Sequence, residues 1–356
     1  MAFMRRLLTI LLLGLCLVAC TQHSTYWGTL LDIESYIEER PDSALVVLEQ
    51  IDISQLSNKE EKAKHAVLLS MALDKNFVDK TDFEVLQPAI DYYEENGSTT
   101  DKLRTYYYQG CIYQNMGNKT LAMESFVKAI SEGCESNDML TMARTYFAQG
   151  TIYFSLYEWD DYIETNKNAA SYFKQAEKYN SYANCLIRII NGYTLNDDAE
   201  NALSYINECK QMLGVISDKR VADFYSAYLI YVTKYGTNQE IDSFINDYIN
   251  IITDSFKDWL TLCNAYYKIG KYEEALHATE QYRSSTNTRD ELKYKALISM
   301  IYEKTDRYEE SLRAYKEFMV VSDSTNLAIM HQDTKFVEER HNLEMAKAKE
   351  TDAKNK

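Results

Sequence analysis

The chain has 356 residues, of which only 2 are Pro and 11 are Gly, too few chain breakers for a loop-rich or many-stranded fold of this length. Helices must therefore dominate. Acidic residues outnumber basic ones by 54 to 38, and no run of Lys or Arg lies beyond the N-terminus, which argues against nucleic acid as the main partner and favours selective contacts with proteins.

Residues 1–20 have the pattern of a signal peptide. Arg5 and Arg6 form its positive end, a short apolar region follows, and Ala19 is the small residue before cleavage. The last four residues, Leu-Val-Ala-Cys, resemble a bacterial lipobox, whose Cys becomes the acylated first residue of the mature protein. This resemblance makes Cys20 the expected lipidation site, and a plain secretory signal or a buried N-terminal helix are the alternatives.

The residues that follow Cys20 bear on the compartment. In the bacterial lipoproteins that this segment resembles, an Asp directly after the lipidated Cys is associated with inner-membrane retention, and here that position is Thr21. Residues 21–24 also lack the acidic cluster that marks surface export. We therefore expect an outer-membrane lipoprotein that faces the periplasm and is held to the membrane through its N-terminal lipid.

Reactive residue types are scattered along the chain rather than clustered. No Gly-rich phosphate loop, H-E-x-x-H, G-x-S-x-G or Ser/His/Asp arrangement occurs, and the five His do not group. Five Cys remain once Cys16 is removed and Cys20 is lipidated, and no CxxC or Cys/His cluster has metal spacing. The sequence predicts unpaired thiols, no metal, no cofactor and no catalytic residue, so we expect a protein that is not an enzyme.

Helical hairpins are expected from the start of the mature chain. The first pairs residues 26–39 with residues 44–50, and Pro41 is expected just outside the second helix because Asp42-Ser43 can cap it.

The second hairpin starts at a capping box formed by Ser57 and Glu60. Its helices are expected over residues 57–73 and 81–95. Six further hairpins are expected over residues 101–133, 138–178, 181–213, 218–253, 258–283 and 290–321.

Two of these hairpins carry a family resemblance. They resemble the tetratricopeptide repeat (TPR) pattern, W-x2-L-G-x2-Y followed by A-x3-F, with Cys263 in place of the Gly in the second copy. The matching residues are Tyr106, Gln109, Gly110, Tyr113, Ala122, Phe126 and Ala129 in the first copy, and Trp259, Leu262, Tyr266, Gly270, Tyr272 and Ala275 in the second.

The resemblance implies an all-α fold in which about eight hairpins stack into a right-handed α-α superhelix, a TPR-like solenoid over residues 21–323. Residues 324–356 are expected to form a C-terminal capping helix and a polar tail. Gly110 should let a neighbouring helix approach closely. Two repeats depart from the pattern, because Tyr162 replaces a small Ala and Ile190 stands where Gly is expected.

In such stacks the first helix of each hairpin lines a concave groove, and its side chains can be assigned by their offset from the core-facing Gly. Basic residues outnumber acidic ones at these offsets, opposite to the chain as a whole. We predict that the groove binds an extended protein or peptide segment, with a preference for acidic ligands. The alternative is that acids simply collect on the convex face. The predicted groove residues are Arg104, Tyr107, Arg144, Phe147, Asn191, Lys257, Asn264, Tyr267 and Lys293.

The sequence therefore predicts a lipid-anchored periplasmic TPR scaffold or adaptor. One alternative is the sensor portion of a membrane regulator, since the chain resembles Bacteroidota-type regulators in which such repeats are joined by a long helix to a membrane span and an output domain. A second alternative is a glycan-binding lipoprotein that uses exposed rings at Tyr107, Phe147, Phe154 and Tyr267.

Overall fold

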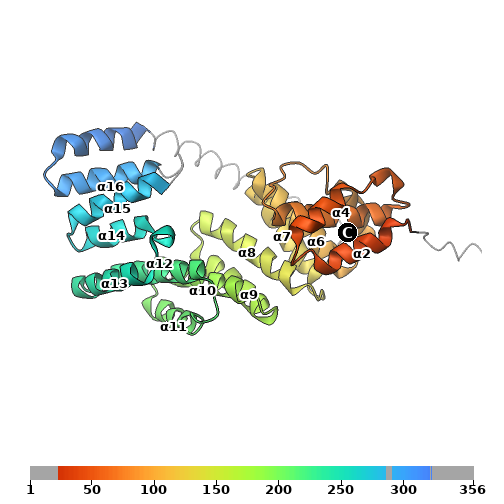
Figure 1. The fold of residues 1–356 in the computed structure, drawn as a ribbon, viewed down its shortest axis with the longest axis horizontal. Coiled ribbons are helices and arrows are strands. Elements are labelled where there is room, and N and C mark those ends of the chain that lie inside the picture. The colour runs from red at the N-terminus through yellow and green to blue at the C-terminus, as the bar shows by residue number, and fades with distance from the viewer. Residues whose placement is uncertain (1–22, 286–290, 321, 323–356) are drawn as a thin grey trace, which may run out of the picture. The chain divides into compact units, whose positions relative to one another are not determined.

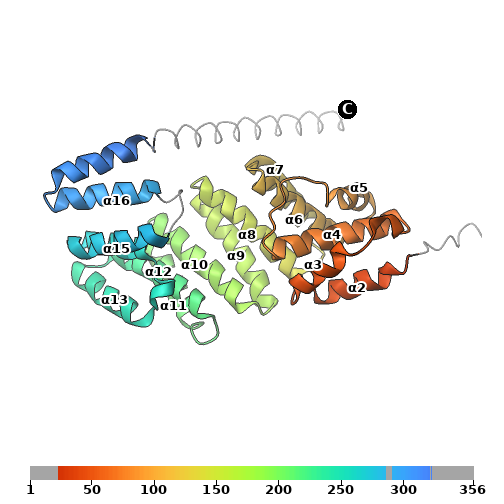
Figure 2. The same cartoon turned by 45° about the horizontal axis from the view of Figure 1, so that its top comes forward.

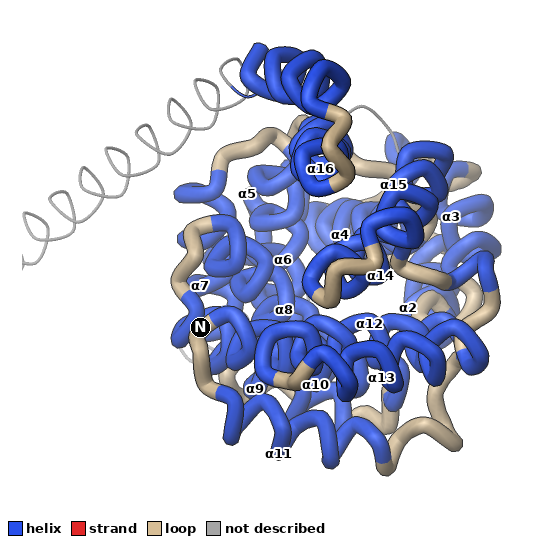
Figure 3. The backbone as a smooth tube through the Cα atoms, turned by 90° about the vertical axis from the view of Figure 1, so that its left-hand side faces the viewer, coloured by secondary structure: helices blue, strands red, loops and turns tan. Residues whose placement is uncertain are grey.

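The computed structural model describes residues 23–285, 291–320 and 322. Every regular element in this part of the chain is a helix, and Figure 3 shows no strand in it. The predicted signal peptide, Cys20 and the C-terminal capping helix lie outside the described residues. The chain divides into two compact units between Met142 and Ala143, within helix α8 (Met139–Ser155).

The first unit is built from antiparallel helix pairs. Helix α3 packs against α4, and α4 packs against α5. Helix α6 packs against α7, and the two lie side by side in Figure 1. The helices are α2 (Tyr26–Tyr36), α3 (Pro41–Glu49), α4 (Lys59–Lys75), α5 (Gln87–Asn96), α6 (Thr99–Asn115) and α7 (Lys119–Gly133), with a 3-10 turn at Ile53–Gln55.

The best preserved repeat, α6 with α7, shows why its glycine is needed. A Cβ atom added at Gly110 would lie 2.4 Å from the ring of Phe126, which comes from α7 and is fully buried. The close approach predicted from the sequence is confirmed, because only a residue without a side chain leaves room for that ring.

The starts of the early helices differ from the prediction. Pro41 lies inside α3 at its first position, and Arg40 is the N-cap. Proline fits there because the missing N–H would have no partner within the helix, and its fixed φ already suits a helix. Helix α5 begins at Gln87 rather than at Thr81.

Helix α4 is capped by a neighbour of the predicted cap. The side chain of Asn58 accepts a hydrogen bond of 2.9 Å from the backbone of Glu61. Glu61 in turn accepts a 2.7 Å hydrogen bond from the backbone N–H of Ser57. The N-cap is therefore Asn58 rather than Ser57, and Glu61 rather than Glu60 is the acid involved. Its carboxylate accepts from the residue before the N-cap, so the two bonds do not form the predicted capping box.

The second unit continues the same architecture. Helix α10 packs against α9, α11 and α12, and α12 packs against α13 and α14; Figure 2 shows α9 beside α10. Residues 308–320 form one more helix. The helices after α8 are α9 (Trp159–Gln175), α10 (Tyr179–Leu195), α11 (Ala199–Lys210), α12 (Asp218–Tyr235), α13 (Asn238–Ile251), α14 (Trp259–Lys268), α15 (Tyr272–Ser285) and α16 (Glu291–Lys304). The predicted all-α fold of consecutive TPR-like hairpins is confirmed.

The repeat in which Tyr162 replaces a small residue packs by a different solution. Tyr162 is only 3% exposed. A Cβ atom added at Gly192, on α10, would lie 3.0 Å from the Tyr162 ring and 2.7 Å from the side chain of Ile163. The space that Tyr162 needs is therefore provided by a glycine on the neighbouring helix, α10. Ile190, at the position where the repeat pattern has Gly, is fully buried.

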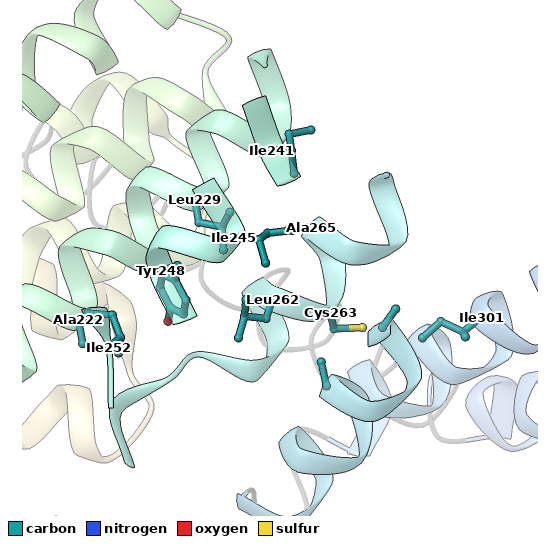
Figure 4. Close-up of a cluster of buried hydrophobic side chains, with 12 residues drawn as sticks. Ala222, Leu229, Ile241, Ile245, Tyr248, Ile252, Leu262, Cys263, Ala265 and Ile301 are labelled. Carbon is teal, nitrogen blue, oxygen red and sulfur yellow. The ribbon is translucent and has the colours of Figure 1, made fainter. Parts of the chain in front are cut away.

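A buried cluster joins α12, α13, α14 and α15, with Leu229, Ile245 and Leu262 directed into it (Figure 4). Tyr248 is fully buried there, and its hydroxyl lies 2.9 Å from that of Ser226. The same hydroxyl accepts a 2.9 Å hydrogen bond from the backbone N–H before α14. The cluster therefore fixes the positions of consecutive first helices by both packing and hydrogen bonding.

Five thiols lie in the described part of the chain, and none of them is in a disulfide: Cys111, Cys134, Cys185, Cys209 and Cys263. Burial raises the pKa of the Cys185 and Cys209 thiols to about 12, so they stay protonated. Among the residues described, no helix is long and apolar enough to span a membrane. In the same residues no group of acids, Cys and His is arranged to bind a metal ion.

Candidate functional site

In the first unit, Arg104 is occupied by ion pairs within the chain. Its guanidinium lies 2.6 Å from Asp138 and also pairs with Glu34 on α2. Asp138 caps α8 by accepting a 3.0 Å hydrogen bond from the backbone of Thr141. A ligand at Arg104 would have to break these pairs, so this predicted groove residue is not available for binding in the described structure.

The protonation of this cluster follows from its partners. Burial by itself would raise the pKa of the Asp138 carboxyl, but the charge of Arg104 and the hydrogen bonds from Thr141 outweigh it and hold the pKa below its usual range. At Glu34, burial likewise acts to raise the pKa of the carboxyl, but the hydrogen bonds and charges of Lys64 and Arg104 outweigh it and lower the pKa. The cluster is therefore charged at neutral pH, as a buried ion pair requires.

Tyr107 was predicted to face the groove, but it is only 7% exposed. Its ring packs edge-on against Tyr108, with centroids 4.9 Å apart, and lies near Phe126. Tyr107 is therefore part of the core of the first unit rather than a surface for a ligand.

Five other predicted residues, all in the second unit, differ in accessibility. The side chain of Lys257 is 9% exposed and lies 2.6 Å from Asp254. Asn264 is exposed, although its amide nitrogen donates to the Leu260 carbonyl oxygen at 2.9 Å. In the same unit, the ring of Tyr267 contacts Tyr272, Lys293 is exposed, and Arg144 is half-buried.

Phe147 and Asn191 instead flank an arginine that the sequence analysis did not select. Arg188, on α10, donates to the Phe147 carbonyl oxygen at 3.2 Å and to the Thr151 hydroxyl at 3.1 Å. Its Nε donates to the hydroxyl of Tyr162 at 3.2 Å. The guanidinium carbon also lies 3.9 Å from the centroid of the Phe147 ring. Contacts with α8 and α9 thus hold Arg188 in one position.

The charge of Arg188 is not neutralised by these contacts. Its partners are a carbonyl, two hydroxyls and aromatic rings, and no carboxylate in the described part of the chain pairs with it. An arginine that is fixed but unpaired with an acid is suited to bind a carboxylate, because its planar group offers parallel N–H donors.

Asn191 lies three residues further along α10 and has an unmet hydrogen-bonding group. Its side-chain oxygen is buried and has no hydrogen-bond partner within the described residues. Such an orphaned acceptor costs about 1–3 kcal/mol unless something donates to it. Leu195 follows on the same face and is 44% exposed, and Ile230 on the adjacent α12 is 37% exposed.

We name Arg188, Asn191 and Leu195 the α10 strip. The three residues fall at i, i+3 and i+7, so they share one face of the helix over about 10 Å. The strip offers in order a cation, a hydrogen-bond acceptor and an apolar surface. These are the groups that an extended peptide with an acidic side chain can bind.

Arg188 lies one position away from the residue that the repeat offsets indicate. On α10 the offset that Tyr107 and Phe147 hold in their own helices falls on Ile187, which is buried, whereas Arg188 makes the contacts at the surface. The signal was present in the spacing of polar residues, since Asn184, Arg188 and Asn191 are the polar residues of an otherwise apolar run over residues 183–191. The buried residues between them are Cys185, Leu186, Ile187, Ile189 and Ile190.

Comparison with known proteins places the fold. No protein-family model matches the chain, and no curated protein matches it. Among solved structures, NprR in complex with its cognate peptide NprX has a TM-score of 0.53 and 16% identity, with 90% of this chain and 98% of NprR covered. A Rap protein complexed with competence and sporulation factor has a TM-score of 0.53 and 15% identity, over 85% of this chain and 98% of that one.

A third neighbour is aspartyl phosphate phosphatase F from Bacillus subtilis, with a TM-score of 0.55, 14% identity and coverage of 95% of this chain and 94% of that one. The likeness is one of fold. It places the chain among TPR-like helical repeat structures, in agreement with the helix pairs described above.

Proposed function

We propose that the protein is a peptide-binding scaffold whose α10 strip receives an extended segment bearing a carboxylate. The observation that carries this proposal is Arg188, which is held by three hydrogen bonds and a ring face without an acidic partner among the described residues. Asn191 lies beside it with an unsatisfied buried oxygen.

The chemistry of binding follows from the donors that remain. A guanidinium has five N–H groups, and the three internal bonds of Arg188 leave one on each terminal nitrogen. Those two donors can bind both oxygens of one carboxylate. The Asn191 oxygen would accept a backbone N–H of the same peptide, and Leu195 would contact an apolar side chain.

The solved structures support this proposal by analogy. NprR was crystallised with a peptide, and a Rap protein with competence and sporulation factor. A shared fold at this level of identity does not transfer a ligand, so the proposal rests on the α10 strip and not on the names of these proteins.

The test is a selection of random peptides displayed on phage against the full-length chain purified in detergent. Enriched peptides should contain Asp or Glu. Their affinity, measured by fluorescence anisotropy, should fall at least about tenfold in Arg188→Gln, because a charged hydrogen bond contributes about 1.5–3 kcal/mol. Arg188→Lys keeps the charge but loses the planar donors and should lie between the two.

Arg313→Gln is the matched control, since Arg313 is exposed on the helix over residues 308–320 of the same unit. It should bind as the parent does. Equal binding by Arg188→Gln, with unchanged thermal unfolding, would overturn the proposal. An equal loss in both variants would show that only net charge matters.

We further propose that Cys20 is lipidated and that the scaffold is held at the outer membrane facing the periplasm. The support is the signal pattern and the lipobox resemblance at residues 17–20. Cells fed an alkynyl palmitate should label the parent chain, and Cys20→Ser should abolish the label. A labelled Cys20→Ser chain would contradict this assignment.

A further inference from the structure

A cavity separate from the α10 strip lies between α11, α12 and α13 in the second unit. It has a volume of about 430 Å³. One wall is aromatic, because Tyr228, Tyr231 and Tyr235 fall at i, i+3 and i+7 of α12 and are joined by Phe244 from α13. Ring centroids of Tyr228 and Phe244 lie 4.5 Å apart, and those of Tyr231 and Tyr235 lie 5.0 Å apart.

The facing wall is acidic. Glu240, Ser243 and Asp247 fall at i, i+3 and i+7 of α13, and all three are exposed. The backbone and hydroxyl of Thr237 both donate to Oε2 of Glu240, at 2.7 and 2.8 Å, which lowers the pKa of this carboxyl. Glu240 therefore carries its charge at neutral pH, and among the described residues nothing donates to its other oxygen.

The rings around this cavity already contact ammonium groups of the chain. Lys210 places its nitrogen 4.5 Å from the centroid of Tyr228, and Lys234 lies 5.5 Å from that of Tyr235. Within the described residues, no cation lies over Tyr231 or Phe244. The faces of electron-rich rings attract cations, so these two rings are the ones left for a ligand.

The same chemistry recurs one repeat later. A cavity of about 460 Å³ is lined by Trp259 and Tyr266 together with Glu273 and Glu274. Glu274 lies four residues after Gly270, as Glu240 lies four residues after Gly236. In this second copy the nitrogen of Lys257 lies 5.7 Å from the centroid of the Trp259 ring, so an internal ammonium faces the aromatic wall.

We propose that the cavity between α11, α12 and α13 binds an organic ammonium ion, seated on Tyr231 and Phe244 and paired with Asp247 and Glu240. An ammonium ion enclosed by rings and carboxylates gains both cation–π attraction and charge pairing. The net charge of −16 raises the concentration of cations near the surface. The ammonium could belong to a free amine or to a methylated lysine of a protein, and both share this chemistry.

The test is isothermal titration calorimetry of the full-length chain in detergent. Choline is the first probe, and its neutral isostere 3,3-dimethylbutan-1-ol is the control for apolar filling of the cavity. Choline should bind and the isostere should not. A short trimethyl-lysine peptide, matched with its unmethylated form, then separates a protein source from a free amine. Equal binding of choline and the isostere, or no binding of either ammonium probe, would overturn the proposal.

Variants locate the site. Tyr231→Phe keeps the ring and should bind choline as the parent does, whereas Tyr231→Leu should bind at least about fivefold more weakly. Asp247→Asn should weaken binding by a similar factor. Tyr179→Leu and Glu280→Gln change exposed residues outside the cavity and are the matched controls. A loss in Tyr231→Phe equal to that in Tyr231→Leu would show recognition through the hydroxyl and would contradict cation binding. None of these residues belongs to the α10 strip, so the two proposals fail separately.

Discussion

Arg104 in the first unit and Arg188 in the second are both arginines on the first helix of a TPR-like hairpin, yet their surroundings differ. Arg104 is neutralised by Asp138 and Glu34, and its contacts join α2, α6 and the cap of α8. Arg188 is also held in place, but by a carbonyl, hydroxyls and a ring. The difference shows that a fixed arginine serves stability where its charge is paired and remains available for binding where it is not.

The largest expected effect is at the paired arginine. Arg104→Ala leaves the Asp138 carboxylate without its cation and Glu34 with Lys64 alone, and we expect the free energy of unfolding to fall by about 3–5 kcal/mol. Hydrogen exchange should show the loss in α2 and α6, with peptide binding retained below the melting transition. The exposed Arg313→Ala should change stability by less than about 0.5 kcal/mol. A comparably small effect in Arg104→Ala would contradict the claim that the paired arginine stabilises the first unit.

The second largest change in the free energy of unfolding is expected at Gly192, which packs against the side chains that support Arg188. A Cβ atom in Gly192→Ala would meet Ile163 and Tyr162, and overpacking of this kind costs about 1–3 kcal/mol. Because Tyr162 accepts a hydrogen bond from Arg188, peptide affinity should fall as well. In Gly28→Ala the new atom has nothing within 4 Å, so this variant should be as stable as the parent or slightly more. Unfolding in urea separates the two.

Acid should affect the two arginines differently. The pKa values of Asp138 and Glu34 are lower in the folded state than in the unfolded chain, where they lie near 4. Their contribution is complete above the unfolded values and is lost as pH falls through the folded ones. Stability of the first unit should therefore decline with acid, and the slope should flatten in Arg104→Ala but not in Arg188→Gln. Identical slopes in all three proteins would contradict this account.

The smallest expected effect is at Asn191. Asn191→Leu removes a buried oxygen that has no partner, so the free energy of unfolding should stay unchanged or rise by up to about 1 kcal/mol. The same variant should lose peptide affinity. A variant that loses both stability and binding would mean that Asn191 supports the helix and does not contact the ligand.

Most of the fold could be predicted because the hairpins carry local signals. Gly117 adopts a positive φ of 77° between α6 and α7, within the predicted hairpin over residues 101–133, and the pair Gly110 and Phe126 packs as the repeat pattern implies. Individual caps were less predictable, since Asn58 and Ser57 are adjacent residues that can both cap a helix, and only the position of Glu61 decides between them.

The site was harder to predict because accessibility depends on tertiary partners. Arg104 and Lys257 have the charge expected for a groove, but Asp138 and Asp254 already pair with them. Arg188 was overlooked because neighbouring positions on a helix differ by 100°, and the offset rule fell on Ile187. Whether the remaining groove residues bind a ligand stays a prediction, as does a single continuous solenoid over residues 21–323.

The packing of Tyr162 against Gly192 has a consequence for anyone who wishes to rebuild this protein from modules. Tyr162 on α9 and Gly192 on α10 belong to two successive hairpins, but they pack directly against each other, and the glycine makes room for the ring. If one hairpin were exchanged alone, Tyr162 and Gly192 would be separated. A large residue in place of Gly192 would then clash with the Tyr162 ring, and a small residue in place of Tyr162 would leave a void. A graft should therefore carry residues 139–210 as one segment, so that its boundaries lie outside this packing contact.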